Sequence, residues 1–172
     1  GLQGEGEALL ALLNTDAARQ NARVDALLPG VKHGDIRRGQ ALFNSDRAAC
    51  SLCHTIGYRG GRLGPDLSNI GRIRQERELL EATLFPSATF VRGYEPYVAT
   101  LRSGETHGGI LRHEAPEEIV LATGPDTEVR IARADLAELQ PGAVSPMPPG
   151  MDALLGPGEI ADLVAFLKSL AR

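Results

Sequence analysis

The residues best suited to chemistry lie together in the stretch AACSLCHTIG, residues 48–57. Cys50 and Cys53 are the only cysteines of the sequence, and His54 directly follows the second. Two thiols separated by two residues can close a disulfide, supply half of a zinc site or take part in dithiol exchange. None of these uses needs a histidine at the next position, so the histidine asks for another explanation.

Cys-x-x-Cys-His is the attachment signature of c-type haem. One helical turn presents both thiols to the same porphyrin edge, where each can form a thioether with a vinyl group. The imidazole that follows is then the proximal iron ligand, and its second ring nitrogen needs a hydrogen-bond acceptor. We therefore expect one covalent haem c, held by Cys50, Cys53 and His54.

Two alternatives use the same cysteines. A thioredoxin-like pair ends a strand in a βαβ unit, whereas here a helical segment precedes the motif and a glycine-rich loop follows it. A zinc site could recruit His107 and His113, but 53 residues separate Cys53 from His107. The zinc-finger pattern has about 12–15 residues at that point. Both alternatives are therefore weaker than the haem interpretation.

The chain has 172 residues, of which 42% are hydrophobic, as in an ordinary globular domain. Its formal net charge of −4 does not suggest a nucleic-acid binder. No apolar run approaches the roughly 20 residues of a membrane span. The first residues lack the basic start and cleavage site of a signal peptide, so we expect either a removed signal or a piece of a longer protein.

The elements that would position the motif are mainly helical. Residues 5–28 read as helical, with a possible cap at Thr15 or Asp16 and an end at Pro29-Gly30. A second helix starts after Asp35, which can cap it. Residues 54–73 read as loop, and 74–85 as a short helix stopped by Pro86.

The period then changes to that of strands. Four short runs, 97–101, 107–113, 118–123 and 127–133, predict an antiparallel meander of three or four strands. A proline-rich loop over 140–151 and a helix from Pro157 close the chain. We expect a mostly α fold with an inserted sheet at about 97–133, in a domain of residues 31–172 that follows a helical extension of residues 1–30. We also expect this sheet to lie outside the minimal frame of the haem crevice.

Five segments in this order resemble a class I cytochrome c over roughly residues 34–172. They are GDIRRGQALF, CSLCH, GPDLSNIG, SPMPPG and EIADLVAFLKSL. Gly39 and Phe43 match the helix that crosses the last helix of that fold, where Leu163 and Phe166 would meet it. With the inserted strands, the chain resembles more closely the haem-binding domains at the C-terminal ends of large exported dehydrogenase-like proteins, chiefly of Planctomycetes and Verrucomicrobia.

The resemblance implies a set of haem contacts. The Pro65 carbonyl would accept the hydrogen bond of the proximal imidazole, and Met147 would be the sixth iron ligand. Pro146, Pro148 and Pro149 would hold the loop around that methionine, while Met151 would pack against the closing helix.

Other residues are possible haem contacts by their chemistry alone. We expect Arg74 to contact a haem propionate, with Tyr94 and Tyr97 as weaker candidates. Arg59, Arg62 and Arg77 are better explained as surface arginines than as propionate contacts. The histidines at positions 33, 107 and 113 are possible rival ligands, although each is more simply a surface residue.

The implied function is one-electron transfer between a redox enzyme, such as a dehydrogenase domain, and an electron carrier. The location would be periplasmic or otherwise exported. We find no acid–base pair or activated nucleophile beside the motif, so we do not expect an enzyme. The alternative is a haem protein with an open sixth site, either peroxidase-like or ligand-sensing.

Overall fold

The computed structural model describes residues 2–171, with side chains described from Asp16 onward. The described residues form seven helices and seven strands, in the following order: α1 Leu2–Val31, α2 Ile36–Phe43, α3 Cys50–Cys53, β1 Thr55–Ile56, β2 Arg59–Gly60, α4 Ile70–Ile73, α5 Glu76–Leu84, β3 Pro96–Leu101, β4 Thr106–Glu114, β5 Glu118–Gly124, β6 Thr127–Ala132, β7 Leu136–Pro141, α6 Met151–Leu154 and α7 Pro157–Ser169.

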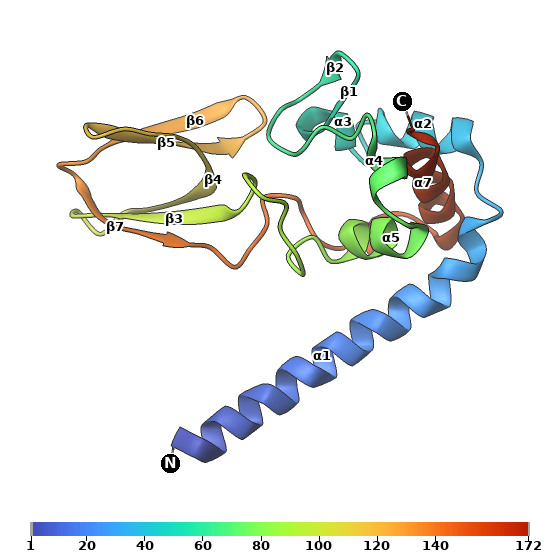
Figure 1. Ribbon diagram of the computed structural model, residues 1–172, viewed down its shortest axis with the longest axis horizontal. Coiled ribbons are helices and arrows are strands. Elements are labelled where there is room, and N and C mark those ends of the chain that lie inside the picture. Colours follow the sequence, from blue (N-terminus) through green and yellow to red (C-terminus); the bar gives the residue numbers. More distant parts are fainter. Residues whose placement is uncertain (1, 172) are drawn as a thin grey trace.

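These elements separate into a helical part and a sheet, which lie side by side (Figure 1). The helical part holds α2 to α7 and the short β1–β2 hairpin. The sheet contains five antiparallel strands in the order β6-β5-β4-β3-β7. Helix α1 joins the helical part at its C-terminal end and extends away from it as a long rod.

The expectation of a mostly helical, class I cytochrome c fold is wrong, because the five-stranded sheet makes this a mixed α and β fold. The sheet encloses a core of its own, formed by Ala99, Ile119, Leu121, Ile131 and Leu136. A segment that buries its own apolar side chains in this way is a structural unit in its own right rather than a small insertion in a helical domain.

Strand β7 was not expected at all. It pairs with β3 from the Tyr97–Pro141 pair onward, whereas the sequence suggested a meander that ended near residue 133. Pro141 cannot donate to a ladder and is tolerated because β7 is an edge strand. The predicted loop over 54–73 also contains structure, namely the two-residue strands of the β1–β2 hairpin and the single turn of α4.

Helix α1 runs further at both ends than expected. Thr15 and Asp16 lie inside it and therefore do not cap it, and Pro29 lies in its last turns without ending it. A proline near a helix end removes only one backbone hydrogen bond, and continuing the helix buries Val31 in the helical core. Within the described residues, no helix is both long and apolar enough to cross a membrane.

The helical core depends on close contact between α2 and α7. A Cβ atom added at Gly39 would lie 2.0 Å from the Asp162 carbonyl oxygen, so only glycine allows this approach. One turn further on, Phe43 and Phe166 pack edge to face with their ring centroids 5.6 Å apart. The expected crossing of these two helices is present.

A buried carboxylate ties the two helices at the start of α2. Asp162 accepts hydrogen bonds from the Asp35 backbone N–H at 2.6 Å and from Arg38 Nε at 2.7 Å. Asp35 itself accepts from the Arg38 backbone N–H, which confirms the expected N-cap. The hydrogen bond from the Arg38 side chain is the main cause that lowers the pKa of Asp162 below its ordinary value.

We expect Asp162→Asn to destabilise the fold by about 1–3 kcal/mol at neutral pH, the usual cost of losing hydrogen bonds to a charged, buried group. Because the folded pKa is lowered, the carboxylate stabilises the fold above its unfolded pKa of about 3.9 and loses this effect as the pH falls. Urea unfolding between pH 7 and pH 3 measures the free energy of unfolding of both proteins. The difference between the variant and the natural chain should shrink below about pH 4. The exposed Asp46→Asn is the control, and a difference that stays constant down to pH 3 would contradict the assignment.

Candidate cofactor-binding site

A cavity of about 370 Å³ lies in the helical part, between the Cys-x-x-Cys-His turn and helices α5 and α7. Its walls are mainly apolar, with a few polar groups, as is usual for a site that binds a small molecule or cofactor. The apolar lining includes Phe43, Leu63, Leu67, Ile70, Leu79, Phe90, Ile110, Leu163 and Leu167.

Both cysteines line this cavity from the single turn of α3. The turn closes with a hydrogen bond from the His54 backbone N–H to the Cys50 carbonyl at 3.0 Å. Burial raises the pKa of both thiols, that of Cys50 to about 11. The attacking thiol of a dithiol-exchange pair has a lowered pKa instead, and neither thiol here shows that shift.

His54 lines the same cavity, and its ring orientation is defined by two neighbours. Its Nδ1 lies 2.9 Å from the Pro65 carbonyl oxygen. A carbonyl can only accept, so Nδ1 carries the proton and Nε2 has a free lone pair. Burial lowers the pKa of His54, although the hydrogen bond to Pro65 opposes this shift. Burial favours the neutral ring and the hydrogen bond holds its proton on Nδ1, which leaves an unprotonated Nε2 facing away from the hydrogen bond, as a metal-binding imidazole requires.

Gly64 fixes the other side of the ring. A Cβ atom at this position would lie 2.5 Å from His54 Cε1 and 2.8 Å from Nδ1. Any side chain would therefore push the imidazole away from Pro65. This requirement was missed in the sequence, where Gly64 was only one of several glycines in an expected loop.

Both methionines also line the cavity, but they are held differently. Met147 is half-buried in the proline-rich loop, and its backbone N–H donates to Ser145 Oγ at 3.1 Å. The Ser145 backbone N–H in turn donates to Ser87 Oγ, which ties this loop to the segment after α5. Met151 is buried in the helical core as the first residue of α6, as expected for a packing residue.

The charged groups at the cavity come from α5 and from Arg74, which lies just before this helix. Arg74 lines the cavity, but its Nη1 donates to Glu78 Oε1 at 2.9 Å. Glu78 also accepts from the Gln75 backbone N–H, and this hydrogen bond is the first cause that lowers its pKa. Arg74 therefore lines the cavity but is already paired with a carboxylate, and its contact with a haem propionate stays a prediction. Glu81, which was not singled out, lines the cavity as well.

Of the other residues considered as haem contacts, some line the cavity and others lie away from it. Tyr94 lines the cavity, whereas Tyr97 packs against the core of the sheet. Arg77 pairs with Asp25 of α1, and Arg59 is exposed. The three rival histidines are not among the residues that line the cavity in the described part of the chain. His33 and His113 are exposed, and His107 lies 3.1 Å from Glu105.

The sheet contributes to the site, which corrects the expectation that it lies outside the frame of the crevice. Ile110 of β4 lines the cavity. It is buried together with Leu63 and Ala122 in a small cluster against which Cys53 packs. The short run over 107–113 predicted a strand but gave no sign of which element its apolar residues would contact.

The ligands that the zinc alternative needs are not brought together. Among residues whose side chains are described, no three His, Cys, Asp or Glu residues are grouped so as to hold a metal ion. Cys50, Cys53 and His107 therefore do not form such a group.

Comparisons with known proteins add little to this geometry. No protein-family model matches the chain, and no curated protein matches it. Among solved structures, an Hfq protein from Anabaena sp. aligns at 22% identity, covering 43% of this chain and 100% of that chain, with a TM-score of 0.25. A likeness at this score carries no inference about fold or function.

Proposed function

We propose that the chain binds one haem c covalently through Cys50 and Cys53 and transfers single electrons. The observation that carries this proposal is the convergence of two thiols, an imidazole hydrogen-bonded to Pro65, and Met147 on one apolar cavity. The spacing of the first three residues brought the hypothesis. The hydrogen bond from His54 to Pro65 and the position of Met147 are independent of that spacing and support it.

The chemistry of the cavity suits such a group. A haem is a large, flat and mainly apolar macrocycle, and the walls are correspondingly aliphatic and aromatic. When bound, it would supply an iron that changes its charge by one electron. The chain's own contribution is to hold that iron with the neutral nitrogen of His54 and the soft sulfur of Met147, and to keep water away.

Met147 favours electron transfer over an open iron site. It lines the cavity from a loop in which Pro146, Pro148 and Pro149 restrict the backbone. Hydrogen bonds through Ser145 and Ser87 tie this loop to the rest of the fold, so little backbone freedom remains to be lost on ligation. A histidine and methionine pair raises the reduction potential of the iron relative to other pairs of ligands, as suits a protein that accepts electrons.

The partner that we propose is a protein, either a dehydrogenase-like domain that donates the electron or a carrier that removes it. The proposed location is periplasmic or otherwise exported. Both points follow from the resemblance to the haem-binding domains of exported dehydrogenase-like proteins.

The first test is whether the haem stays with the protein. After coexpression with a haem-attachment system, acid–acetone extraction should leave the colour on the chain, and the intact mass should exceed that of the polypeptide by one haem. The matched control is the double variant Cys50→Ala and Cys53→Ala, which should release its colour. A colourless natural chain that carries zinc would refute the proposal.

The second test separates the two methionines. Met147→Ala should remove the sulfur-to-iron charge-transfer band, lower the reduction potential and allow rapid binding of carbon monoxide or cyanide, because the iron loses its thioether ligand. Met151→Ala is the matched control and should change none of these. If the natural chain binds these ligands as rapidly as Met147→Ala does, the open-site alternative is correct.

A further inference from the structure

The loop that carries the His54 acceptor is held on its inner side by the cysteine motif. The Gly61 backbone N–H donates to the Ser51 carbonyl at 2.9 Å, and the Gly64 backbone N–H donates to the Cys53 carbonyl at 2.8 Å. Gly61 also lies so close to the Leu52 carbonyl that a Cβ atom would come within 1.8 Å of it. The position of Pro65 therefore depends on how this short loop sits against α3.

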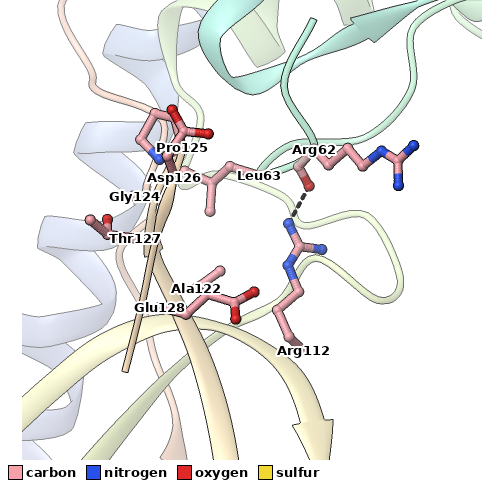
Figure 2. A pocket seen from close by; sticks show the side chains of 9 residues that line it. All are labelled: Arg62, Leu63, Arg112, Ala122, Gly124, Pro125, Asp126, Thr127 and Glu128. Atoms are coloured by element: carbon pink, nitrogen blue, oxygen red, sulfur yellow. Dashed lines mark hydrogen bonds between the residues drawn. The ribbon is translucent and has the colours of Figure 1, made fainter. Parts of the chain in front are cut away.

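The outer side of the same loop is held by the sheet. Arg112 of β4 donates from Nη2 to the carbonyl oxygen of Arg62. Figure 2 shows this side chain reaching across to the loop, with Leu63 next to the point of contact. Leu63 is buried against Ile110 and Ala122. One polar contact and one apolar contact thus fix two successive loop residues, which lie immediately before Gly64 and Pro65.

The backbone of β4 is irregular at the residue that makes the polar contact. Leu111 pairs with Leu121 and His113 with Val120, so Arg112 is left without a partner on β5. Such a bulge re-aims a side chain and is common next to functional sites. The Arg112 guanidinium also lies 5.8 Å from the centre of the Tyr94 ring, within the range of a cation–π contact, and Tyr94 itself lines the cavity.

We infer that Arg112 is a positioning residue for the iron-binding imidazole. It would hold the loop of residues 61–65 against the cysteine motif, so that the Pro65 carbonyl stays in hydrogen-bond contact with His54. The inserted sheet would thereby control the hydrogen bond that His54, the proximal iron ligand, makes through Nδ1. Such contacts determine the orientation and basicity of a metal-binding histidine. This inference rests on the proposed function, because it takes His54 to be the iron ligand.

The test is the hydrogen–deuterium exchange of the His54 Nδ1 proton in the reduced, haem-loaded protein, followed by NMR. Arg112→Met should speed this exchange by roughly tenfold or more, the equivalent of one net hydrogen bond. Arg112→Lys, which keeps a cation that can donate to Arg62, should restore much of the protection. The control is Arg130→Met, which removes an arginine of β6 paired with Glu118 in the same sheet and should leave the exchange unchanged.

The outcomes separate the two claims. If the natural chain carries no covalent haem, the proposed function fails and this inference fails with it. If haem is bound but Arg112→Met exchanges at the natural rate, only the inference fails, even if the variant melts at a lower temperature. If Arg112→Met does not fold, Arg112→Lys decides by itself: exchange as slow as in the natural chain supports the inference, whereas exchange tenfold faster means that a cation at this position does not hold the loop.

Discussion

The hydrogen bond from His54 Nδ1 to the Pro65 carbonyl oxygen is the interaction on which the site depends. It assigns the ring proton to Nδ1, leaves the Nε2 lone pair free to bind a metal ion and limits rotation of the imidazole. Burial alone would not orient this ring. The acceptor is a backbone group only 11 residues away, so the conformation of the short loop between them determines whether the hydrogen bond can form.

The rest of the fold supports that loop from two sides. On one side, α2 and α7 meet through Gly39 and Asp162 and form the core on which α3 and the cavity rest. On the other side, the sheet presents Ile110 and Arg112 to the loop. The sheet has its own core, and one of its strands forms part of the cavity wall through Ile110. Its addition to a helical unit gives the mixed architecture and also completes the cavity.

Local features of the chain could be predicted from the sequence because they depend on neighbouring residues. The Asp35 cap, the start of α7 at Pro157 and the end of α5 before Pro86 all follow from short patterns. The helical turn over Cys50–Cys53 belongs to the same class, since the residues that form it are neighbours in the chain.

Features that depend on distant contacts could not be predicted in this way. Strand β7 exists because it pairs with β3, and α1 continues past Pro29 because Val31 finds a place in the core. The predicted fold class is wrong for the same reason, since the short runs of the sheet do not reveal the core that they share. Arg74 is an exception, because it pairs with Glu78 only four residues further on, a contact that the spacing in the sequence could have indicated.

The central claim is that one iron is held between His54 and Met147 in this cavity. The most direct measurement is a crystal structure with diffraction data collected on both sides of the iron absorption edge. We predict a single anomalous peak within bonding distance of His54 Nε2 and Met147 Sδ, with electron density continuous to both cysteine sulfurs. A peak that appears only at the zinc edge, or iron bound away from His54, would contradict it.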